Sequence, residues 1–124
     1  MWTKEIVLSL ATQLRDPFME GEFLTVFCTF PDLENARRVV DRLVKDRLIA
    51  CGNIFPAVES IYRWKGKIER SFEALAILKT TRDKFSRLEA VFKELHPYEV
   101  PELIAAPISN GLPAYLAWIT QNVK

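Results

Sequence analysis

The residues of this chain that are most able to do chemistry are its single histidine and its two cysteines. His96 opens the segment His96–Glu102, which also holds a tyrosine, two glutamates and two prolines that restrict the backbone to a few conformations. Histidine is the side chain whose ordinary pKa lies closest to neutral pH, so a stiff connector that carries it is a candidate functional site. The alternative is that His96 only ends the helix before it, where a positive charge favours the carbonyl end of the helix dipole.

Cys28 and His96 together offer the thiolate and imidazole donors that a soft metal ion such as Cu(I) prefers, with water or a neighbouring subunit completing the site. As a nucleophile and its base, they would need to be adjacent in space and joined by a third, orienting group, and the sequence holds no evidence of that adjacency. Cys28 is also typical of a small apolar residue in a buried strand, and Cys51 has no charged residue beside it to activate it. The sequence contains no glycine-rich phosphate loop, no CxxC or HxxxH pair and no Ser/His/Asp constellation.

A second set of side chains suits either a ligand cleft or a wet interface. Tyr62, Trp64 and Tyr98 combine a large apolar ring with a polar tip, and such residues are common in both settings. Lys79 lies near the end of an apolar run, where it could meet a carboxylate such as Glu102 or an anionic ligand, or simply extend its amine into water. The sequence leaves these alternatives open.

The periodicity of apolar residues predicts the elements that position these side chains. It first predicts a central strand buried on both faces over 23–30, then a helix over 33–48 capped by Asp32, and then a strand over 49–55 that Pro56 bends or bulges. A hairpin of 60–64 and 67–81 follows around the turn Lys65-Gly66. The chain is then predicted to form a helix from Thr81 to 95, a strand over 102–108 and a last helix from about Pro113. This order is that of the ferredoxin-like split β-α-β fold. The predicted class is therefore α+β, one mainly antiparallel sheet with two helices on one face, a long hairpin and an extra C-terminal helix.

The returning arm of the hairpin, residues 67–81, contains no proline or glycine. Fully extended at about 3.3 Å per residue, it would be roughly 50 Å long. A compact domain of this size has a diameter of only about 35 Å. The arm therefore bends at a bulge, or it projects beyond its own domain and pairs with another chain.

Composition bounds the class of protein. The 124 residues include 17 Lys plus Arg and 16 Asp plus Glu, a balance that argues against a large basic surface for nucleic acid or membrane binding. No apolar run approaches the roughly 20 residues that span a bilayer. Both cysteines lie in apolar runs, which predicts reduced thiols and a cytoplasmic location. Residues 1–22 are predicted to be an N-terminal arm outside the fold, since Glu5 and a short apolar run disfavour a signal peptide, and residues 23–124 to be a single domain.

Several separate motifs, in the right order over residues 23–122, resemble the CutA family. They are Thr29–Asp32, Leu48–Ile54, Ser60–Ile68 with Glu73, Leu78–Thr81, His96–Glu102 and Tyr115–Trp118. The resemblance implies a ferredoxin-like subunit in a tight homotrimer, assembled through the long hairpin strands. It also implies a role in tolerance of divalent metals, with copper or another divalent metal ion held by Cys28 and His96 and no organic cofactor. Some members carry two adjacent histidines, whereas this chain has Leu95-His96.

Three functions follow, and they belong to different classes. The first is a cytoplasmic homotrimer that binds a divalent metal in metal tolerance and catalyses nothing. The second is a signalling or scaffold trimer like the PII proteins, with a small ligand or partner protein in an intersubunit cleft lined by Tyr62, Trp64, Lys79, Tyr98 and Glu102. The third, an enzyme with Cys28 as its nucleophile, is the least favoured because no activating base is indicated.

Overall fold

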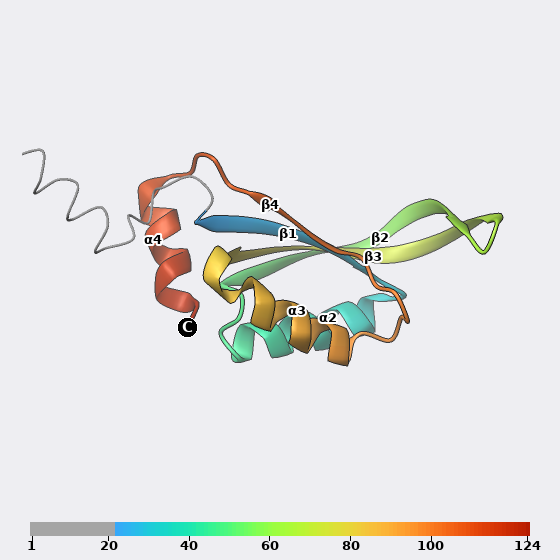
Figure 1. Cartoon of the computed structure of the whole chain (residues 1–124), viewed down its shortest axis with the longest axis horizontal. Helices are drawn as coiled ribbons and strands as arrows, with labels where there is room; N and C mark the ends of the chain where they lie inside the picture. The colour runs from blue at the N-terminus through green and yellow to red at the C-terminus, as the bar shows by residue number, and fades with distance from the viewer. Residues whose placement is uncertain (1–21) are drawn as a thin grey trace, which may run out of the picture.

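The computed structural model describes residues 22–124 of the chain, so the predicted N-terminal arm lies outside the described residues except for Glu22. The elements are β1 (Phe23–Phe30), α2 (Leu33–Lys45), β2 (Cys51–Trp64), β3 (Lys67–Thr81), the short 3-10 helix η1 (Arg82–Lys84), α3 (Phe85–Leu95), β4 (Leu103–Pro107) and α4 (Pro113–Asn122). The four strands form one antiparallel sheet in the order β2-β3-β1-β4. Helices α2 and α3 lie side by side on one face of it, which confirms the predicted ferredoxin-like split β-α-β fold (Figure 1).

Strand β1 lies in the middle of the sheet because both of its edges are paired, with β3 and with β4. Val26, Cys28 and Phe30 point toward the helices and are fully buried. The prediction that β1 is buried on both faces was wrong for the single chain, since Thr25 and Phe27 are only half-buried on the face that carries no helix. This open face is where further protein could cover the sheet.

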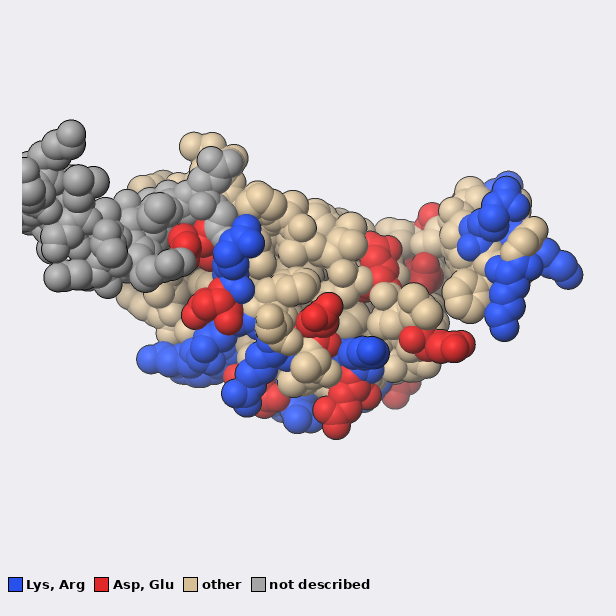
Figure 2. Space-filling model, in the orientation of Figure 1, with Lys and Arg blue, Asp and Glu red and all other residues tan. Residues whose placement is uncertain are grey.

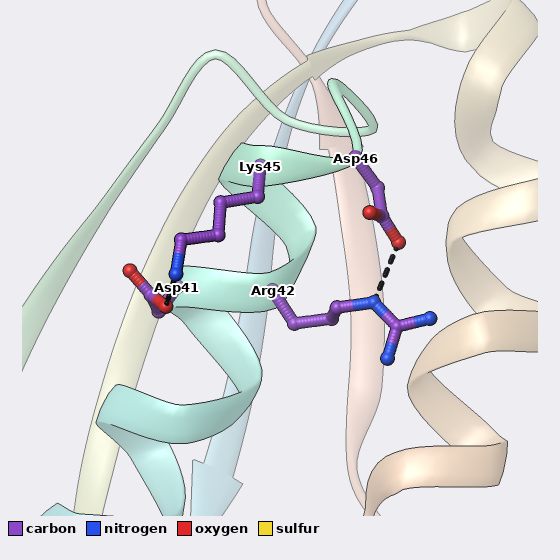
Figure 3. A network of polar contacts seen from close by, with 4 residues as sticks. All are labelled: Asp41, Arg42, Lys45 and Asp46. Carbon is purple, nitrogen blue, oxygen red and sulfur yellow. Dashed lines mark hydrogen bonds and ion pairs between the residues drawn. The ribbon is translucent and has the colours of Figure 1, made fainter.

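Helix α2 begins where the sequence places its cap. The Asp32 carboxylate accepts a hydrogen bond from the backbone N–H of Asn35 at 2.8 Å, which satisfies one of the free donors of the first turn. Its outer face carries two ion pairs one turn apart, Arg42 with Asp46 and Lys45 with Asp41, each at 2.8 Å (Figure 3). All four side chains are exposed to solvent, Asp46 the least at 36%, so this charged face is a solvated surface rather than a site.

The long hairpin is continuous across Pro56. A bulge between Phe55 and Val58 takes up the proline, and β2 runs on to Trp64. Lys65 and Gly66 both have positive φ angles, 50° and 81°, as the tightest hairpin turns require. The far half of the hairpin projects beyond the sheet and helices, at the opposite end of the molecule from α4 (Figure 1).

The helix that was predicted to start at Thr81 begins later. Thr81 is the last residue of β3, and its hydroxyl donates to the Asp83 carboxylate at 2.5 Å instead of capping a helix N–H. The 3-10 turn η1 therefore separates β3 from α3. Pro113 occupies the first turn of α4, as predicted. In the described part of the chain, no helix combines the length and the apolar content that crossing a membrane requires.

Candidate functional site

His96 is held on every side by its own chain. It follows α3 as the C-cap residue, and its backbone N–H donates to the Phe92 carbonyl at 2.9 Å. The ring stacks on Phe30 with 4.9 Å between centroids. Its Nε2 lies 2.7 Å from the Thr29 carbonyl oxygen and its Nδ1 accepts the N–H of Tyr98 at 3.0 Å. These partners assign the neutral tautomer with the proton on Nε2, because a carbonyl can only accept and an N–H can only donate.

The surroundings of His96 keep it neutral. Burial lowers the pKa of the imidazole below its ordinary value of 6.5, and the positive charge of Arg38 lowers it further, while the hydrogen bond to Thr29 and the charge of Glu73 partly oppose this. Both ring nitrogens are already hydrogen-bonded. A metal ion could bind His96 only after the ring gave up its bond to Thr29 or to Tyr98.

Cys28 lies in the hydrophobic core with no exposed surface. Its Sγ is 3.8 Å from the Ala76 carbonyl oxygen. Burial, and to a smaller extent the negative charge of Glu102, raises the pKa of the thiol to about 12. The thiol is therefore protonated at neutral pH, which does not suit a nucleophile or a ready metal ligand. Among residues 22–124, no hydrogen bond joins Cys28 to His96, and no group of three or more His, Cys, Asp and Glu side chains is arranged to hold a metal ion.

A cleft of about 760 Å³ lies between the hairpin and the connector that follows His96. It brings together four of the five residues that the sequence nominated for a cleft, Tyr62, Trp64, Tyr98 and Glu102. Its other lining residues are Thr29, Pro31, Ser60, Ile61, Ser71, Phe72, Glu73, Glu99 and Val100. The volume falls within the range of small-molecule sites in proteins.

Glu73 anchors the connector to the hairpin across this cleft. The Tyr98 hydroxyl donates to Glu73 Oε2 at 2.9 Å, and Glu73 is only 9% exposed. Burial and the neighbouring Glu73 carboxylate both raise the pKa of Tyr98, so the phenol stays protonated and keeps its role as donor. Neither Glu73 nor Glu99 was nominated as a cleft residue, although Glu73 belongs to the motifs that carry the family resemblance and Glu99 lies in the segment His96–Glu102. The sequence did hold a signal for Glu73, because a charged residue beside the apolar run of β3 is unusual unless it has a partner.

Lys79 does not reach the cleft. It stands opposite Cys51 on β2 and Thr25 on β1, and its Nζ donates to the Asn53 side-chain oxygen. The same oxygen accepts the Cys51 thiol at 3.7 Å. Cys51 has no charged residue next to it in the sequence, as expected, but strand pairing places Lys79 directly opposite it. The sequence could not predict this, because the separation of Lys79 and Glu102 along the chain does not show which residues pair across the strands.

The fold and the cleft define a class: antiparallel split β-α-β proteins with a projecting hairpin and a cleft between that hairpin and the connector that leads into β4. Residues 24–122 match the model of the CutA1 divalent ion tolerance protein family. The chain belongs to this family, as its motifs indicated. It is 45% identical over 97 residues to the divalent-cation tolerance protein CutA of Thermus thermophilus, covering 78% of this chain and 94% of that protein. It is 39% identical over 104 residues to Protein CutA of Mus musculus, covering 84% of this chain and 59% of the mouse protein.

Solved structures agree with this assignment. The CutA1 structure from Thermus thermophilus matches with a TM-score of 0.80 at 43% identity, covering 82% of this chain and 99% of that one. The CutA1 structure from Oryza sativa matches with a TM-score of 0.82 at 34% identity, covering 88% and 98% of the two chains. A third, with a TM-score of 0.80 at 38% identity and coverage of 82% and 99%, is described as the periplasmic divalent cation tolerance protein CutA from Archaeoglobus fulgidus.

Proposed function

We propose that this chain acts in divalent-cation tolerance as a homotrimer that binds a cation and catalyses no reaction. Membership of the CutA1 family supports the role in tolerance. The burial and protonation of Cys28 support the absence of nucleophilic catalysis, since only a thiolate attacks. Two free cysteines fit a reducing compartment, and we place the protein in the cytoplasm.

The proposal of a trimer is supported by one observation: large apolar side chains of the hairpin are exposed to solvent in the single chain. Phe72 is 71% exposed and Ile68 57% exposed, although both lie in a regular strand. Ile104 on the outer strand β4 is 58% exposed. Large apolar side chains exposed on regular strands are typical of an interface, and the unpaired edges of β2 and β4 could add strands from other copies. Light scattering at micromolar concentration tests this, and a monomer would contradict the proposal.

For the cation we retain Cys28 and His96 as the pair to test, because they supply the soft donors that Cu(I) prefers. In this conformation both are engaged and the thiol is protonated, so binding requires the ring to turn and a proton to leave Cys28. Titration with Cu(I) and Cu(II) should give weaker binding to a Cys28→Ser, His96→Ala variant than to the wild type. Equal affinity would exclude this pair as the ligands. Cys51→Ser is the matched control, because it removes the other thiol.

A second candidate function is a receptor trimer of the PII kind, whose cleft takes a small ligand or a segment of a partner protein. The specific observation in its favour is the 760 Å³ cleft with Tyr62, Trp64, Tyr98 and Glu102 in its lining. A ligand screen by thermal shift, repeated with Trp64→Ala, tests it. Lys79→Ala serves as a control outside the lining. A ligand whose stabilising effect survives Trp64→Ala but not Lys79→Ala would contradict this candidate.

A further inference from the structure

The cleft has an acidic lining. Three glutamates line it, and within residues 22–124 none of its lining side chains is a lysine, an arginine or a histidine. Glu99 and Glu102 are exposed at its rim, while Glu73 is buried at its wall. The chain as a whole has a formal charge of only +1, so this concentration of carboxylates is local. A cleft lined by one sign of charge attracts ligands of the opposite sign.

A bare metal ion does not fit the way these carboxylates are arranged. No three of the His, Cys, Asp and Glu side chains in the described part of the chain converge as metal ligands. Glu73 already accepts the hydroxyl of Tyr98. The carboxylates instead surround a cavity of about 760 Å³, which matches a cation with a carbon skeleton better than a single ion.

Aromatic faces line the same cleft. Tyr62, Trp64 and Tyr98 all contribute to it, and the face of an aromatic ring attracts an ammonium or guanidinium group. The ring of Trp64 already shows this behaviour within the chain, because the Nζ of Lys65 lies 5.8 Å from its centroid. Carboxylates beside aromatic faces are the combination that recognises organic cations in water.

We infer that the cleft binds an organic cation, through an ammonium or guanidinium group held between its glutamates and its aromatic rings. The inference rests on the ligand cleft proposed above as the second candidate function and names the chemistry of its occupant. The group has two sources that share this chemistry. One is a free alkylamine, and the other is the basic tip of the hairpin of a second copy, where lysines and arginines gather (Figure 2).

Calorimetric titration of the full chain with putrescine, butanediol and succinate tests the charge preference, since the three probes share a four-carbon skeleton. Putrescine should bind, and the neutral and anionic probes should not. Glu99→Gln and Glu102→Gln should each weaken putrescine binding by about tenfold, because each removes one charge-assisted contact. Glu89→Gln, an exposed glutamate of α3 outside the cleft, makes the same charge change and should have no effect. Trp64→Leu should weaken binding by about threefold.

A tip variant, Arg63→Gln with Lys67→Gln, separates the two sources. If the tip of a second copy supplies the cation, putrescine binds this variant more tightly than the wild type, and light scattering shows weaker assembly. If the ligand is free, both affinity and assembly are unchanged. Binding of succinate or butanediol in preference to putrescine would overturn this inference while leaving a ligand cleft in place. If none of the three probes binds to the wild type or to the tip variant, the inference is overturned. The trimer is tested separately, by light scattering of the wild type.

Discussion

Acid should destabilise this protein through one side chain, and the structure fixes the sign of the effect. His96 is the only histidine in the chain, so it is the side chain whose ordinary pKa, 6.5, lies between pH 5 and 7. Burial lowers the pKa of this imidazole in the folded state. At pH values between the folded-state pKa and the unfolded-state pKa, the unfolded chain binds more protons than the folded chain. The free energy of unfolding therefore rises with pH in this range. The stability contributed by neutral His96 is fully present above pH 6.5 and is lost as the pH falls through the folded-state pKa.

The magnitude follows from the one hydrogen bond of the ring that protonation breaks. Protonation turns Nδ1 into a donor that faces the backbone N–H of Tyr98, so that bond is lost. The net contribution of one such hydrogen bond is about 1 kcal/mol. Linkage limits the slope to about 1.4 kcal/mol per pH unit for one proton per chain. Acidification from about pH 7.5 to about pH 5 should therefore lower the free energy of unfolding by an amount on the order of 1 kcal/mol.

Urea unfolding at fixed protein concentration measures this, because oligomerisation makes apparent stability depend on concentration. The matched variant is His96→Gln, whose amide cannot titrate. It should be less stable than the wild type at neutral pH, but its free energy of unfolding should change less over the same pH range. A wild-type stability that stays constant or rises on acidification would refute the reasoning. So would an equal pH dependence in the variant, since that would assign the effect to carboxylates.

Three further outcomes are expected. Phe72→Glu should lower the mass measured by sedimentation without loss of secondary structure by circular dichroism, because Phe72 is exposed in the single chain; an unchanged mass would show that this face is not an interface. Tyr98→Phe should destabilise the protein by about 1–3 kcal/mol in urea unfolding, since it leaves the buried Glu73 carboxylate without its donor; no loss would mean that water replaces the phenol. In the native protein, iodoacetamide followed by peptide mass spectrometry should label half-exposed Cys51 before buried Cys28, and the reverse order would contradict the burial of Cys28.

Local chemistry explains why the fold could be predicted. The cap at Asp32, the turn at Lys65-Gly66 and the first-turn Pro113 depend on residues within one or two turns of backbone, and all three lie where the sequence placed them. The late start of α3 could not be predicted in this way. The pattern at Thr81 allowed a cap, but its hydroxyl found the Asp83 side chain while strand pairing with β1 kept Thr81 extended.

By itself the sequence determined the α+β class and the order of the elements, because apolar periodicity and turn residues act over short distances along the chain, and its motifs indicated the family. For the long arm of the hairpin it left open a bend at a bulge or a projection beyond the domain, and the structure shows both. The sequence also nominated Tyr62, Trp64, Tyr98 and Glu102 for one cleft. Only the tertiary structure decided which partners each side chain meets. It engaged both nitrogens of His96 and moved Lys79 away from the cleft, and it added Glu73 and Glu99 to the lining. The reason is that these contacts depend on strand register and helix packing between segments far apart in the chain, and the pattern of neighbouring residues does not encode them.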